Sequence, residues 1–177
     1  MEYTNFILRM GGLKMFERFI QTPLGEVRLR SDGESLTGLW FVGQVNDAKD
    51  VNDIEIQDDL PIFGQVESWL ESYFSGKKTP IMIPLQPKGT IFQERVWKIL
   101  QEIPYGDTMT YGDIAQRIAK EKGVATFSAQ AVGQAVGKNP ISIFVPCHRV
   151  VGKNGTLTGY AGGIYRKEQL INLEKGK

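Results

Sequence analysis

The sequence predicts an α/β protein of two domains, with a strand-rich first half and a helical second half. From Phe16 to Phe41 apolar side chains occur at alternate positions, which is typical of antiparallel strands. From about residue 91 onward the apolar residues recur at helical spacing instead. Between the halves lies KKTPIMIPLQPKG (77–89), whose three prolines indicate a linker. We therefore expect an N-terminal domain over 16–86 and a C-terminal domain over 87–177.

The first half predicts a sheet followed by one helix. Residues 16–41 favour an antiparallel meander, because turn signals occur at Pro23–Gly25 and Ser31–Gly33. The acidic stretch from Asn46 to Asp59 predicts a loop, and the segment that starts at Lys77 predicts a short strand that enters the linker. A helix is expected within 60–76, with Gly76 as its stop. Its apolar face consists of Phe63, Val66, Trp69, Leu70 and Phe74.

The second half predicts four helices. The first lies in TIFQERVWKILQEIP (90–104), and the second opens at Thr110-x-x-Asp113, which is close to a capping box. A third, rich in small residues, spans about 127–137, and the pair fits a helix-turn-helix. Short helix pairs are common, however, and most bind nothing. ISIFV (141–145) predicts a short buried strand, GKNGTLTGYAGG (152–163) a glycine-rich loop, and YRKEQLINLEK (165–175) a closing helix.

The composition narrows the class of protein. No apolar run approaches the roughly 20 residues that cross a bilayer, and the first fifteen residues lack the features of a signal peptide. A single cysteine cannot form an intramolecular disulfide, and one cysteine with one histidine cannot build the usual four-ligand zinc site. These observations favour a cytoplasmic protein without a structural metal or a membrane partner.

Charge divides unevenly between the halves. Residues 1–86 hold 8 Lys/Arg and 13 Asp/Glu, a balance of −5, whereas residues 87–177 hold 13 and 7, a balance of +6. A basic half suggests a polyanionic partner such as nucleic acid. Two solvated surfaces of different composition would give the same numbers.

The segment FVPCHRVVG (144–152) contains the only cysteine, Cys147, beside the only histidine, His148. A lone cysteine is commonly a small buried apolar residue. Here Pro146 predicts a turn at the thiol, and His148 and Arg149 form a setting that favours a thiolate. Adjacency in sequence does not establish a Cys–His contact, although a water could bridge the two side chains.

Five segments together resemble one family, the O6-alkylguanine-DNA alkyltransferases, also called methylated-DNA–protein-cysteine methyltransferases. VPCHRV (145–150) is similar to the active-site signature of that family. The other four are TPLGEVRLRSDGESLTGLWF (22–41), IPYGDTMTYGDIA (103–115), AVGQAVGKNPI (131–141) and GTLTGYAGGIYRKEQLINLE (155–174). The resemblance covers Phe16 to Glu174 in the order of the family. It implies a ribonuclease-H-like antiparallel sheet plus helix, followed by a winged helix-turn-helix domain.

The resemblance also implies a reaction. The family transfers an alkyl group from O6 of guanine in double-stranded DNA, and by extension from O4 of thymine, to a cysteine, once per molecule and without metal or cofactor. Cys147 would be the acceptor, His148 would take its proton through a water, and Glu174 would orient His148. Asn139 would hold the active-site turn, and Tyr111 would donate a hydrogen bond to the guanine.

Further positions match the family's DNA and base contacts. The second helix of the helix-turn-helix would enter the minor groove, and the target base would flip out of the stack. The implied base pocket consists of Tyr160, Ala161, Val150 and Lys167, and the implied DNA contacts are Ala129, Gln130, Ala131, Gly133 and Arg149. Gln130 departs from the family, since many members have an arginine there. A glutamine predicts weaker and less salt-dependent DNA binding.

Three alternatives stay open from the residues alone. A non-catalytic sensor of alkylated DNA would lack the cysteine of this motif, and a transcription regulator of this family would carry an additional cysteine-rich metal module. A Cys–His thiol hydrolase would turn over repeatedly. We expect a monomer, with residues 1–15 as an N-terminal extension.

Overall fold

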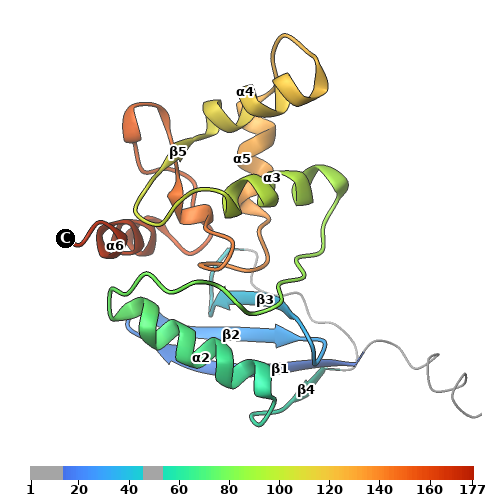
Figure 1. Ribbon diagram of the computed structural model, residues 1–177, viewed down its shortest axis with the longest axis vertical. Helices are drawn as coiled ribbons and strands as arrows, with labels where there is room; N and C mark the ends of the chain where they lie inside the picture. Colours follow the sequence, from blue (N-terminus) through green and yellow to red (C-terminus); the bar gives the residue numbers. More distant parts are fainter. Residues whose placement is uncertain (1–13, 46–53) are drawn as a thin grey trace, which may run out of the picture.

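The computed structural model describes residues 14–45 and 54–177. Its N-terminal half is a four-stranded sheet in the order β3-β2-β1-β4, with one helix against it (Figure 1). Strands β1, β2 and β3 pair antiparallel, as the meander prediction requires. The elements are β1 (Met15–Thr22), β2 (Gly25–Ser31), β3 (Leu36–Phe41), β4 (Ile54–Ile56) and α2 (Pro61–Phe74).

The fourth strand was missed by the sequence analysis, which predicted a loop over Asn46–Asp59. Ile54–Ile56 pairs parallel with Met15–Glu17 at the edge of the sheet. All three residues of β4 are partly or fully exposed, so their pattern carries no signal of burial. This segment therefore forms a strand because it pairs with β1. Residues 46–53 and the expected extension, apart from its last two residues, lie outside the described part of the chain.

The C-terminal half contains the helices that were expected. Its longer helices are α3 (Ile91–Gln101), α4 (Tyr111–Lys122), α5 (Ala129–Gly137) and α6 (Ile164–Glu174). Its short elements are β5 (Met109–Thr110), η1 (Cys147–Arg149), β6 (Val150–Val151) and η2 (Lys153–Gly155). Among the longer helices, α3, α4 and α5 lie away from the sheet, whereas α6 lies closer to it (Figure 1). None of the helices in the described ranges is long and apolar enough to span a membrane.

Local capping explains why α4 and α5 form a helix-turn-helix. Thr110 accepts a hydrogen bond from the Asp113 amide, and Asp113 accepts one from the Thr110 amide, which completes the predicted capping box. Gly123 ends α4 in the left-handed region, at φ 66°, and Ser128 caps α5. The two helices pack directly against each other. The turn chemistry of the sequence is thus sufficient to place both helices.

The strand predicted over 141–145 is wrong. Ile141 forms only an isolated bridge to Leu39, and Ile143 has a φ of 71°, so the chain winds into a compact turn. Asn139 causes this conformation, because its side chain bonds the Ile141 amide and the Val145 carbonyl. Such side-chain bonds offer the backbone an alternative to a strand ladder. The short strand expected after Lys77 is likewise absent from the described residues, where Leu85 makes a single bridge to Leu36.

The two halves share one apolar core. The Leu39 amide of β3 donates to the Pro140 carbonyl, and the Leu39 carbonyl accepts from Ser142. The ring of Trp69 on α2 lies 4.3 Å from that of Phe144. Buried side chains from both halves form a continuous cluster. The turn at 139–149 is therefore packed between the sheet and the helices.

Candidate active site and nucleic-acid interface

Cys147 lies at the start of the one-turn helix η1, directly after the turn that Asn139 holds. Its side chain is 5 % exposed. The Asn139 side-chain amide donates to the Val145 carbonyl at 2.7 Å and to Cys147 Sγ at 3.1 Å. Asn139 thus orients both the backbone that presents the thiol and the sulfur itself.

His148 is completely buried, and of its two ring nitrogens only Nε2 makes a hydrogen bond to the described residues. Its Nε2 lies 2.7 Å from Oε1 of Glu174, in the last turn of α6. Its Nδ1 makes no hydrogen bond to the described residues. Burial lowers the pKa of His148 more than the hydrogen bond and charge of Glu174 raise it. The imidazole is therefore neutral, with Nε2 as donor and Nδ1 as an available acceptor.

Glu174 is the most heavily bonded group of the site. Its Oε1 accepts from His148, from Tyr73 at 2.7 Å and from Arg149 Nη2 at 3.0 Å. Its Oε2 accepts from Arg149 Nε at 2.8 Å and from the Gly106 amide at 3.1 Å. Burial alone would raise the pKa of Glu174, but the hydrogen bonds from His148 and Arg149 hold it well below its usual range. The carboxylate thus stays charged beside a neutral imidazole.

The thiol of Cys147 is protonated at rest, which corrects the expectation of a thiolate-favouring setting. Burial raises its pKa, and the hydrogen bond from Asn139 and the charge of Lys167 only partly offset this. Arg149 directs its charge to Glu174, and His148 is neutral. Neither neighbour therefore supplies the positive charge that was expected. A thiol of this kind needs a base to become a nucleophile.

Tyr111 and Lys167 both interact electrostatically with Cys147. The Tyr111 hydroxyl donates to the Thr158 and Gly159 carbonyls, each at 3.1 Å, and its pKa is raised by burial and by Cys147. Lys167 is fully buried, donates to the Thr158 carbonyl at 2.7 Å and lies over the Tyr111 ring. Both residues thus hold the glycine-rich loop, Tyr111 from α4 and Lys167 from α6.

The implied base-pocket residues differ in exposure. Tyr160 and Val150 are buried, whereas Ala161 is partly exposed. Burial raises the pKa of Tyr160 well above its usual value, and Cys147 contributes to this shift. Tyr160 and Lys167 therefore share the electrostatic surroundings of the thiol.

Helix α5 presents an open face next to Tyr111. Ala129 and Gln130 are exposed, and Ala131 and Gly133 are partly exposed. A Cβ atom on Gly133 would lie 3.7 Å from the Tyr111 ring. The absence of a side chain at Gly133 thus lets α5 lie close to the Tyr111 ring.

The DNA contact predicted for Arg149 does not fit its geometry. Its Nε and Nη2 both donate to Glu174, and its Nη1 donates to the Ile103 carbonyl at 2.6 Å. Every nitrogen of this guanidinium is thus used inside the molecule. Through these bonds Arg149 ties the active-site segment to Glu174 of α6 and to Ile103 after α3.

Two contributors to the site were missed by the sequence analysis. Tyr73 of α2 is 101 positions away from Glu174, and Gly106 acts through its backbone. Tyr73 had a detectable signal, since it lies one turn after Trp69 and Leu70 on the buried face of the helix. A tyrosine in such a position requires a partner for its hydroxyl. The local sequence does not indicate that this partner is Glu174.

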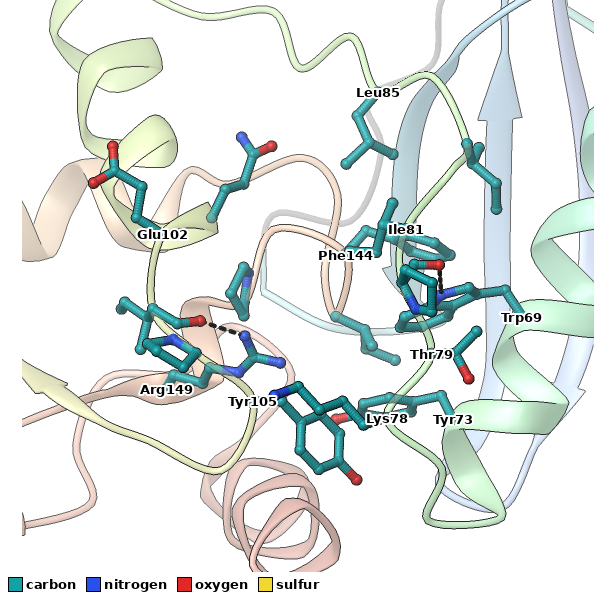
Figure 2. Close-up of a pocket in the computed structure, with 17 residues that line it drawn as sticks. Trp69, Tyr73, Lys78, Thr79, Ile81, Leu85, Glu102, Tyr105, Phe144 and Arg149 are labelled. Atoms are coloured by element: carbon teal, nitrogen blue, oxygen red, sulfur yellow. Dashed lines mark hydrogen bonds between the residues drawn. The ribbon is translucent and has the colours of Figure 1, made fainter.

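A pocket of about 650 Å³ lies between the two halves of the chain, next to Tyr73 and Arg149 (Figure 2). Tyr73, Tyr105, Phe144, Pro146 and Arg149 are among its lining residues, and Cys147 is not. The pocket therefore borders the donors of Glu174 rather than the sulfur. The described residues contain no group of three or more His, Cys, Asp or Glu side chains that could hold a metal ion.

The fold and the site define a class: a two-domain protein with a helix-turn-helix and a buried cysteine beside a neutral histidine. A family model for the 6-O-methylguanine DNA methyltransferase ribonuclease-like domain matches residues 15–87, and one for the DNA-binding domain of the same family matches residues 91–176. The chain belongs to the 6-O-methylguanine DNA methyltransferase family.

Individual relatives agree with this assignment. The methylated-DNA–protein-cysteine methyltransferase of Methanosarcina mazei is 46 % identical, over 91 % of this chain and 98 % of that protein. Its counterpart from Haemophilus influenzae is 43 % identical, over 91 % of this chain and 87 % of that protein. The crystal structure of Mycobacterium tuberculosis OGT in complex with DNA superposes with a TM-score of 0.81 at 42 % identity, over 91 % and 93 % of the two chains.

Proposed function

We propose that this protein repairs double-stranded DNA by moving the alkyl group of O6-alkylguanine onto Cys147. The observation that carries the proposal is the pairing of a neutral, buried His148 with the charged Glu174, at the position that follows the protonated thiol of Cys147 in the chain. Such a pair is a general base, and a base is what this cysteine needs. The family and the DNA complex of the Mycobacterium tuberculosis relative supply the substrate class.

The reaction balances without a cofactor. His148 Nδ1 takes the proton of Cys147 through a water, and Glu174 stabilises the imidazolium that forms. The sulfur attacks the alkyl carbon, so that an S–C bond forms as the C–O6 bond breaks. Guanine leaves as an anion, and the Tyr111 hydroxyl stabilises this anion with a hydrogen bond, because its raised pKa keeps it protonated. The imidazolium of His148 then returns the proton to guanine through water. The thioether does not hydrolyse, so each molecule reacts once.

We propose that α5 binds the DNA and that the loop around Tyr160 receives a flipped base. The exposed Ala129 and Gln130, with the small residues that follow, allow the helix to approach the minor groove closely. An alkyl group on O6 is out of reach inside a duplex, so the base must leave the stack. O4-alkylthymine presents a similar alkyl–oxygen bond and is a second expected substrate.

Mass spectrometry of the intact protein tests the transfer. After incubation with a duplex that contains one O6-methylguanine, we expect a gain of one methylene mass on the peptide of Cys147, saturating at one equivalent. Cys147→Ser is the matched control and should gain nothing. An unchanged mass with selective binding of the damaged duplex would make the protein a sensor, and repeated turnover of a thioester would make it a hydrolase.

The cellular setting is a separate proposal. We place the protein in the cytoplasm as a monomer, which is compatible with a single cysteine that needs to stay reduced. Fractionation of cells and light scattering of the purified protein test the two parts.

A further inference from the structure

Tyr73 brings the N-terminal half of the chain into direct contact with the active site. It lies in the last turn of α2, is 1 % exposed, and donates its hydroxyl to Glu174 Oε1 at 2.7 Å. The same oxygen accepts the bond from His148 Nε2. Figure 2 shows Tyr73 and Arg149 along the pocket between the halves, and both donate to Glu174.

We propose that Tyr73 is a positioning residue of the alkyl-transfer reaction: its hydroxyl sets how strongly Glu174 stabilises the protonated form of His148. The inference rests on the proposed function, because it assigns His148 the role of base. It adds a contribution from the ribonuclease-like half of the molecule to the chemistry at Cys147.

Packing does not require this hydroxyl. The Tyr73 ring is already held by the Trp69 ring, stacked at 5.1 Å, and by an edge contact with Tyr105 at 6.1 Å. A phenylalanine would keep both contacts. The carboxylate does not depend on Tyr73 for its place either, since Arg149 holds both oxygens and the Gly106 amide holds Oε2. What the hydroxyl adds is a second short hydrogen bond on the oxygen that faces His148.

The direction of the effect on the pKa of His148 follows because Tyr73 and His148 both donate to Oε1 of Glu174. A hydrogen bond to a carboxylate oxygen withdraws negative charge that would otherwise stabilise the imidazolium. Loss of the Tyr73 hydroxyl therefore raises the pKa of His148. The other groups that face the pair are Arg149 from η1, Lys167 from α6, Tyr105 from the segment after α3, and Cys147. All of them stay in place when Tyr73 is changed to phenylalanine.

The test is an NMR titration of the full-length protein, in which His148 is the only histidine and its ring signals need no assignment. We expect Tyr73→Phe to raise the pKa of His148 by about half a unit. The acid limb of the pH–rate profile for transfer from an O6-methylguanine duplex should move upward equally. At pH values well below the pKa of His148 the variant should then react about threefold more slowly, because a smaller fraction of His148 is in the neutral form that acts as the base.

Tyr105→Phe is the matched control. It removes a hydroxyl next to the Tyr73 ring that makes no hydrogen bond to the described residues, so it should leave the His148 titration in place. An unshifted pKa in a folded Tyr73→Phe protein, or equal shifts in both variants, overturns the inference. The titration needs no transfer activity. A wild-type protein that titrates as expected but transfers nothing would thus contradict the proposed function instead.

Discussion

Lys167 shows how one buried charge responds to its surroundings. Its side chain is fully buried, and burial lowers its pKa to about 8, with Cys147 acting in the opposite direction. Between pH 8 and the unfolded value near 10.5 the unfolded chain therefore binds more protons than the folded one. The contribution of Lys167 to stability therefore rises with pH in this window, and the raised pKa of the Cys147 thiol opposes it in part. We expect the free energy of unfolding to increase by about 1 kcal/mol between pH 8 and pH 9.5. In urea-unfolding measurements, Lys167→Met should abolish this increase.

Lys175→Met provides the comparison for this measurement. Lys175 is exposed just after the same helix, so its loss should leave the pH dependence of the wild-type protein intact. Were Lys167→Met to keep the full rise between pH 8 and pH 9.5, the charge of Lys167 would not be its source.

Helix α5 carries the exposed Gln130, at a position where the resemblance to the family leads us to expect an arginine. Gln130 is the second residue of the helix and is open to solvent. Its side chain is uncharged, so it neutralises no phosphate. We expect Gln130→Arg to bind an O6-methylguanine duplex more tightly at low salt and to steepen the slope of log affinity against log salt by about 0.9. Fluorescence anisotropy over a salt series measures both.

The control for this prediction adds the same charge elsewhere. Gln65 is exposed on α2, in the other half of the chain, so Gln65→Arg should change the salt slope much less. Equal slopes for wild type and Gln130→Arg would mean that this position does not approach the DNA backbone.

The two halves should unfold together, because one core and the bonds of Glu174 connect them. Phe144 packs on Trp69 of α2, and Leu39 of β3 bonds with both Pro140 and Ser142. We expect the slowest-exchanging amides of β2 and α3 to report the same free energy of opening in hydrogen exchange. Phe144→Ala should lower both values equally, by about 3 kcal/mol.

Ile91→Ala is the comparison for this variant, since Ile91 is 91 % exposed and packs little. It should leave both free energies close to those of the wild type. Different free energies for β2 and α3, or a loss confined to one of them after Phe144→Ala, would show that the halves unfold separately.

Local patterns were sufficient for most of the secondary structure. The alternation in 16–41, the apolar face of 60–76 and the Thr110-x-x-Asp113 cap each correspond to an observed element. These signals concern residues a few positions apart, whose interactions are the same in any fold. The error at β4 occurs where a distant segment decides, because this strand exists only through its pairing with β1. The error at 141–145 is local, because the side chain of the nearby Asn139 draws these residues into a turn that their apolar pattern does not indicate.

The sequence by itself determined the helices, the meander and the presence of one Cys–His pair, and the resemblance of its motifs indicated the family. Only the tertiary structure decided the protonation of that pair. Burial keeps the thiol protonated and the imidazole neutral, and it depends on the whole shell around them. Tertiary structure alone also directed Arg149 inward and brought Tyr73 to Glu174 across 101 positions. A hydrogen bond depends on distance in space, and spacing along the chain does not encode that distance for residues in different halves.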